Sequence, residues 1–189
     1  MRIAFSDIIN NSKQVLINPK LFWVNKKVKL DSQSKLTWRF LIPIVFIVAV
    51  AVFIGEFFRC SDFYTGTALL KSLRIIVLFL LQYFITVFFT NELIKTFGGE
   101  KNIDISRNLV AYSLTPLLLV SIVTGLIPFL YIIGILGLYS FYIFWIGAKE
   151  LLVFPENKMS SYALITVLVS FFIFSFLSII LSKLVTAYY

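Results

Sequence analysis

Histidine is absent from the 189-residue sequence, and cysteine occurs once, at Cys60. Carboxylate side chains are also few, with nine aspartates and glutamates in total. Without histidine the chain cannot build Ser-His-Asp or Cys-His nucleophilic sites or imidazole-ligated zinc, and a single cysteine cannot form an internal disulfide. We therefore predict a protein that is not an enzyme and that carries no metal and no cofactor.

Charge is scarce as well. Only 14% of the residues are charged, 60% are hydrophobic, and the mean hydropathy is +0.96. Soluble domains have about 25% charged and about 45–50% apolar residues, and a single soluble core has no room for this much apolar surface. The composition predicts an all-α, polytopic membrane protein, because a chain crosses the bilayer most simply as apolar helices of about 20 residues.

Five apolar runs are long enough to cross a bilayer. They lie at 38–58, 73–91, 109–124, 128–147 and 162–181. The third and fourth come from one stretch of 41 residues without a charge, Asn108 to Ala148, which is too long for one span and suits two. Gly125 and Pro128 supply the turn between them. The sequence thus predicts a five-helix transmembrane domain, 38–189, preceded by a segment at 1–37.

The net charge of +8 is concentrated in that first segment, which precedes most of the apolar chain. Eight of the 17 lysines and arginines lie before residue 40. Across all flanks of the predicted spans, thirteen basic residues fall on the N-terminal side of the membrane and four on the other. Lysine and arginine mark the cytoplasmic side, so we predict the N-terminus inside and the C-terminus outside. No nucleic-acid recognition motif accompanies the charge, and we predict no nucleic-acid partner.

Segment 1–37 has the pattern of short amphipathic helices. Asn18 and Pro19 are typical of a helix cap followed by the first helical position. The helix that they begin carries basic and aromatic residues expected at the anionic inner leaflet. These residues are Lys20, Trp23, Lys26, Lys27 and Lys29. Two interpretations remain open at this point: a membrane-surface anchor, or a docking surface for a protein partner on the cytoplasmic face.

Two polar residues in the apolar runs are candidates for a function inside the membrane, because burying such groups in lipid is costly. Glu56, at the outer end of the first span, is either a proton or cation ligand or a carboxylate paired with a basic neighbour. The neighbours are Arg59, Lys71 and Arg74. Gln82, in the middle of the second span, suits a hydrogen bond between helices or a substrate contact.

Small residues recur in the fourth span. Gly134, Gly137 and Ser140 are spaced by three, and Gly147 continues the same face. In lipid, such stripes mark close helix packing, either within one subunit or at the seam of a homo-oligomer. Pro116 lies within the third span, where it either kinks or breaks the helix.

These motifs resemble a known family. Ala111-Tyr-Ser-Leu-Thr-Pro116, a Gly/Pro break, Gly134-Ile-Leu-Gly-Leu-Tyr-Ser140 and Gly147 are similar to the core of the Yip family of membrane proteins. The family-motif residues are Tyr112, Ser113, Pro116, Gly134, Gly137, Tyr139, Ser140 and Gly147. The earlier Asn18-Pro-Lys-Leu-Phe-Trp23 stretch resembles the N-terminal part of bacterial members.

The resemblance implies five transmembrane helices with a cytoplasmic N-terminus, and for a bacterial-type member it implies the cytoplasmic membrane. Eukaryotic members are Golgi and ER proteins linked to Rab GTPases, but the Asp-Leu-Tyr-Gly-Pro segment typical of them is absent here. We therefore predict a non-enzymatic membrane scaffold or adaptor, linked to membrane organisation or trafficking. The alternative is a small-solute channel or transporter, or a bundle that translocates lipid.

Overall fold

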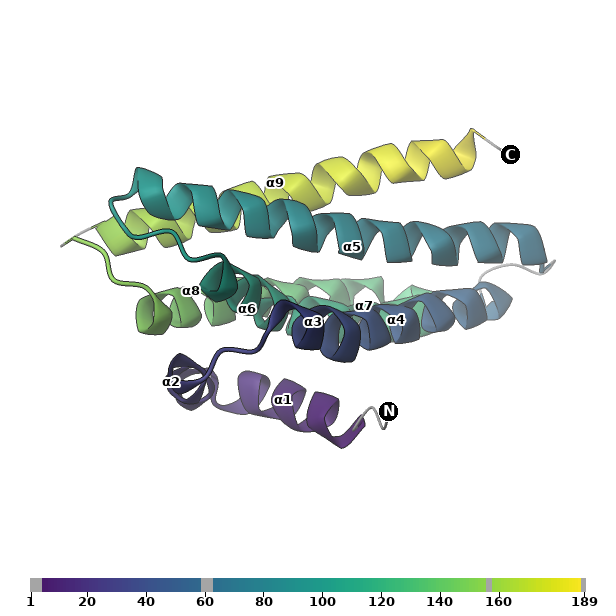
Figure 1. Ribbon diagram of the computed structural model, residues 1–189. Coiled ribbons are helices and arrows are strands. Elements are labelled where there is room, and N and C mark those ends of the chain that lie inside the picture. Colours follow the sequence, from purple (N-terminus) through teal and green to yellow (C-terminus); the bar gives the residue numbers. More distant parts are fainter. Residues whose placement is uncertain (1–4, 59–62, 156–157, 188–189) are drawn as a thin grey trace.

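The computed structural model describes residues 5–58, 63–155 and 158–187, and Figure 1 shows how its helices are arranged. Within these residues the chain forms helices joined by short loops, without strands. Five helices are long and apolar enough to cross a membrane: Gln33–Phe58, Thr65–Thr96, Ile103–Leu126, Pro128–Leu151 and Lys158–Thr186. The all-α bundle of five spans is therefore confirmed. Each helix extends beyond its apolar run at one or both ends, because the helical hydrogen bonds continue into the polar flanks, so the first span begins at Gln33 rather than at 38.

Several of these spans are divided into named elements. The first contains α3 (Gln33–Leu36), a π-helical turn (Thr37–Leu41) and α4 (Ile42–Gly55), and ends in a 3-10 turn (Glu56–Phe58). The others are α5 (Thr65–Thr96), α6 (Ile103–Ser113) with α7 (Thr115–Leu126), a 3-10 segment (Pro128–Leu138) with α8 (Tyr139–Leu151), and α9 (Lys158–Thr186). Two shorter helices, α1 (Phe5–Ile17) and α2 (Pro19–Val28), precede them.

The long helices α5 and α9 run side by side along one side of the molecule (Figure 1). α4 packs between α5 and α7, and α7 packs against the 3-10 segment. On the other side, α2 lies against α8, and α1, which precedes α2 in the chain, contacts α2 and α7. The N-terminal helices therefore form part of the packed structure.

The third span is interrupted at Leu114. α6 ends at Ser113, α7 begins at Thr115, and Pro116 occupies the first turn of α7, where its missing N–H disrupts least. The N–H of Leu117 finds its acceptor on another helix, the Oγ of Ser140, at 3.2 Å. The Gly125–Pro128 turn is confirmed, since α7 ends at Leu126 and the next helix begins at Pro128.

The first half of the fourth span is a 3-10 helix of 11 residues, Pro128–Leu138. Such helices have three residues per turn and are uncommon beyond three or four residues. This geometry explains the spacing of the small residues, because positions three apart lie on one face. Gly134 and Gly137 therefore lie one above the other, with Ser140 just beyond at the start of α8.

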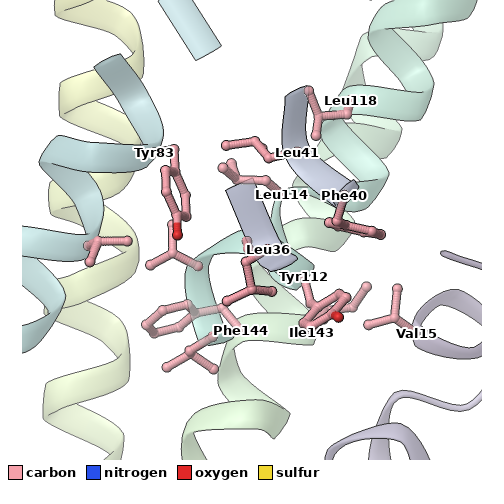
Figure 2. Packing of buried hydrophobic residues seen from close by; sticks show 14 of the residues in the cluster. Val15, Leu36, Phe40, Leu41, Tyr83, Tyr112, Leu114, Leu118, Ile143 and Phe144 are labelled. Carbon is pink, nitrogen blue, oxygen red and sulfur yellow. The ribbon is translucent and has the colours of Figure 1, made fainter. Parts of the chain in front are cut away.

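The apolar core includes side chains from both the spans and the N-terminal helices. Figure 2 shows Val15 of α1 on the same side of the cluster as Tyr112 of α6 and Phe40 of the first span. Val15 and Trp23 of α2 are both fully buried. Apolar burial on this scale is what holds a short helix onto a bundle.

Candidate functional site

Trp23 fixes α2 to the bundle. Its indole is fully buried, and its Nε1 donates a hydrogen bond to the Ile143 carbonyl of α8 at 3.1 Å. The ring lies directly over Gly147, where an added Cβ would be 2.5 Å from the indole. Only glycine leaves room for this contact. The prediction that Trp23 contacts the membrane surface is therefore wrong, because the groove over Gly147 accepts the indole inside the protein.

Asp31, in the loop between α2 and the first span, forms a second attachment of the N-terminal segment to the bundle. Its carboxylate is buried and accepts hydrogen bonds from Lys26, from Lys35 at 2.5 Å and from the Tyr112 hydroxyl at 2.5 Å. Its backbone is held as well: the Asp31 N–H donates to Asn108 Oδ1 at 3.0 Å, and Asn108 Nδ2 donates to the Asp31 carbonyl at 2.9 Å. These five residues are called the Asp31 clasp below. They tie the N-terminal segment to α6.

Aromatic rings surround the charged part of the clasp. The Lys26 ammonium lies 4.7 Å from the centre of the Tyr112 ring and 5.5 Å from that of Phe22, at cation–π distance. Phe22 also packs edge-on against Tyr112 at 4.9 Å. Only 14% of the Lys26 side chain is exposed. Lys26 is therefore largely an internal ion-pair partner, which differs from its expected place among the surface lysines.

The clasp predicts a specific pH dependence of stability. Burial alone would raise the pKa of Asp31, but hydrogen bonds from Lys26, Lys35 and Tyr112 outweigh it and lower the pKa from 3.8 to about 2. A lowered pKa stabilises the folded state above pH 3.8, and this stabilisation, about 2 kcal/mol, is lost as the pH falls toward 2. Thermal unfolding followed by circular dichroism from pH 6 to pH 2 should show the loss. Asp31→Asn should remove that component, and an unchanged pH profile in this variant would contradict the assignment.

The opposite face of α2 is directed away from the bundle. Lys20 and Lys27 lie along one edge of it, Lys29 follows the end of the helix, and all three are exposed. Leu21, Val24 and Val28, at 42% to 88% exposure, form the adjoining apolar ridge. Together these six residues are called the outer face of α2. Lysines beside exposed aliphatic side chains are typical of helices that contact a bilayer surface or a partner.

Glu56 lies buried at the end of the first span, where Lys71 Nζ approaches its carboxylate at 2.6 Å. Lys71 is one of the three neighbours predicted as partners. Arg74 instead hydrogen-bonds to α9. Arg59 lies outside the described residues, as does Cys60. The pair with Lys71 neutralises the Glu56 charge locally.

Gln82 is 2% exposed and connects two spans, because its Nε2 donates to the Ser170 carbonyl of α9 at 3.0 Å. This is the hydrogen bond between helices that the sequence suggested. A carbonyl oxygen only accepts hydrogen bonds, so the amide nitrogen must face Ser170. The Gln82 Oε1 is buried without a protein hydrogen-bond partner in the described chain, and Gln82 is one of the residues that line a cavity inside the bundle.

The family-motif residues separate into two groups. Tyr112 and Gly147 hold α2 and its following loop, and Tyr139 donates a hydrogen bond to the Leu16 carbonyl of α1 at 3.0 Å. The other group lines the cavity beside Gln82: Ser113, Gly134, Gly137 and Ser140. Pro116 lies in the first turn of α7.

Sequence reasoning missed the remaining members of the clasp. Asp31 stands among lysines, which was a signal for an internal ion pair. Asn108 precedes the long uncharged stretch, which was a signal for a buried polar contact. Neither signal names a partner, because Asp31 and Asn108 meet only once the helices have packed.

Comparison with known proteins supports the resemblance to the Yip family. A family model, the Yip1 domain, matches residues 13–179. No curated protein and no solved structure matches the chain significantly. The matched region includes α2, the Asp31 clasp and all the motif residues of the third and fourth spans. This multi-spanning membrane protein therefore belongs to the Yip1 domain family.

Proposed function

We propose that this chain is a non-enzymatic membrane scaffold or adaptor that acts in membrane organisation or trafficking. The bundle holds α1 and α2 in place, and the outer face of α2 contacts anionic inner-leaflet lipids and a protein partner. The observation that carries the proposal is the double attachment of α2, through Trp23 over Gly147 and through the Asp31 clasp. A short helix attached in this way presents its outer face in a fixed position, which lowers the entropy cost of binding.

The charge distribution supports the proposed orientation. Basic residues predominate on the side of the membrane that carries α2, as expected for a cytoplasmic face. Lysines near an anionic surface contribute about 1 kcal/mol each. The buried carboxylates of Asp31 and Glu56 are both paired with lysines, so they stabilise the fold.

Neutralising the outer face should remove the contacts without unfolding the bundle. The variant is Lys20→Gln, Lys27→Gln, Lys29→Gln, and it leaves Lys26 in the clasp. We expect anionic lipid and any near-stoichiometric protein partner to co-purify in mild detergent at least tenfold less than with the unmodified chain. Quantitative lipid and protein mass spectrometry of the purified material measures both.

The matched control removes the same charge elsewhere. Lys95→Gln, Lys101→Gln, Lys158→Gln changes three exposed lysines, in the last turn of α5, in the loop before α6 and at the start of α9. It should retain what co-purifies with the unmodified chain. Equal losses in the two triple variants would show a general charge effect. Full retention in both variants would contradict the proposal that the outer face of α2 contacts lipid or a protein partner.

A further inference from the structure

A cavity of about 170 Å³ lies among the second, third, fourth and fifth spans. Helices α5, α6, α7, α8 and α9 and the 3-10 segment all contribute to its lining. Three of the lining residues, Gly134, Leu138 and Phe171, are exposed. They mark a mouth between the 3-10 segment and α9. Because these elements belong to the fourth and fifth spans, the mouth opens sideways toward the acyl chains of the bilayer.

Three residues that line this cavity each carry a buried side-chain oxygen without a protein hydrogen-bond partner in the described chain. The three oxygens are Gln82 Oε1, Thr86 Oγ1 and Ser113 Oγ. Their residues are 2%, 4% and 5% exposed. A buried polar atom without a partner costs about 1–3 kcal/mol. Three residues from two helices that carry such atoms and line the same cavity indicate a site for a ligand that hydrogen-bonds to them.

The lining restricts the chemistry of the ligand. None of the described residues that line the cavity is charged, and most are apolar, including Phe141, Phe144 and Phe174. A charged group would be costly there, so the ligand is neutral. The Gln82 Oε1 only accepts and requires a hydroxyl or N–H from the ligand, whereas the Thr86 and Ser113 hydroxyls can also donate to a carbonyl.

The size of the cavity restricts the ligand further. A volume of about 170 Å³ is close to that of an engineered cavity that binds benzene. It accepts the polar end of a lipid but not its tails, which have to leave through the mouth. Diacylglycerol meets these requirements, because it is uncharged, resides in the bilayer, and has a free hydroxyl beside ester carbonyls. We propose that this cavity binds the hydroxyl-bearing end of diacylglycerol, with the acyl chains passing between the 3-10 segment and α9. The scaffold function does not depend on this site.

Binding is tested on the full purified chain in mild detergent with a fluorescent diacylglycerol. We expect saturable binding that unlabelled diacylglycerol displaces. Triacylglycerol, which lacks the hydroxyl, and phosphatidylglycerol, which is charged, should compete at least tenfold less well. The proposal is overturned if binding does not saturate, if triacylglycerol competes equally, or if the anionic phospholipid is the better competitor.

Two variants test the site itself. Thr86→Val, Ser113→Ala removes both hydroxyls at nearly constant volume and should weaken diacylglycerol binding about tenfold. The matched control is Ser121→Ala, Thr124→Val, whose hydroxyls donate to carbonyls of their own helix α7 at 2.7 and 3.1 Å. It should bind as the unmodified chain does. Equal binding by the cavity variant and the control would contradict the proposed contacts.

Gly134→Leu blocks the mouth without relying on the hydroxyls. A Cβ at Gly134 meets no atom within 4 Å, so the bundle accommodates a side chain there. The leucine should lower diacylglycerol affinity at least tenfold while the thermal unfolding midpoint stays close to that of the unmodified chain. Unchanged affinity in this folded variant would overturn the proposed entry path.

Discussion

Trp23→Ala should detach α2 from the bundle and lower the free energy of unfolding by about 3–5 kcal/mol. The substitution removes a fully buried indole, the hydrogen bond to the Ile143 carbonyl and the contact over Gly147. The bundle can fill the space only in part, because the groove is shaped by the backbone of α8. Denaturant unfolding in detergent measures the loss, and cleavage by a lysine-specific protease near Lys27 reports the release of α2.

Two further variants separate this effect from the general loss of a tryptophan. Trp38 is 65% exposed, so Trp38→Ala should change stability by less than about 1 kcal/mol. Gly147→Ala should release α2 in the same way as Trp23→Ala, because the added Cβ would be 2.5 Å from the indole. If Trp38→Ala cost as much as Trp23→Ala, or if α2 stayed resistant to protease in both Trp23→Ala and Gly147→Ala, the attachment described here would be incorrect.

Asp31→Ala should be nearly as damaging, at about 3–5 kcal/mol, because it leaves the Lys26 ammonium largely buried without its carboxylate. It also removes the acceptor of the Tyr112 O–H, so this buried hydroxyl keeps only the hydrogen bond that its oxygen accepts from Lys26 at 3.1 Å. Urea unfolding at neutral pH measures the change. The N-terminal segment should again become accessible to protease, since the clasp joins it to α6.

Asp104 provides the control for this prediction. It pairs with Arg107 at 3.0 Å on the surface, where 56% of its side chain is exposed, so Asp104→Ala should cost less than about 1 kcal/mol. Adding Lys26→Met to Asp31→Ala should recover part of the loss, because the uncompensated charge is then removed. A loss in Asp31→Ala no larger than in Asp104→Ala would mean that the clasp is not a stabilising contact.

Hydropathy alone was sufficient to predict the five spans, because lipid requires each span to be long, apolar and helical. The turn at Gly125 and Pro128 and the cap at Asn18 were also predicted. The Asn18 side chain accepts from the Leu21 N–H at 3.2 Å, which confirms the cap. All these features depend on neighbours in the sequence, and local residue preferences are enough to specify them.

The attachment of α2 depends on contacts between distant residues, and here the sequence was ambiguous. A helix with lysines and aromatic residues fits a membrane surface as well as a protein groove. The decisive residue for Trp23 is Gly147, far along the chain, and glycines in membrane helices have many other roles. The interpretation of segment 1–37 as an anchor or docking surface therefore stays a prediction for its outer face, whereas its inner face belongs to the core.

The cavity could not be predicted from the sequence, because it too depends on contacts between distant residues. The sequence singled out Gln82 as an intramembrane polar residue and Ser113 through the family motif, but nothing linked them. Thr86 lies one helical turn after Gln82 and was not considered, because threonine is common in membrane helices. Only the packing of α5 against α6 brings these three residues to the lining of one cavity.

Backbone amide exchange of α2 in the unmodified chain, reconstituted in lipid nanodiscs, tests the central claim most directly. An isolated helix of ten residues is barely stable in water, so slow exchange requires docking. We predict that the amides of residues 21–28 exchange about as slowly as those of α8, against which α2 packs. Exchange at the rate of an unstructured peptide, in a bundle whose spans remain protected, would contradict the claim that the bundle holds this helix in place.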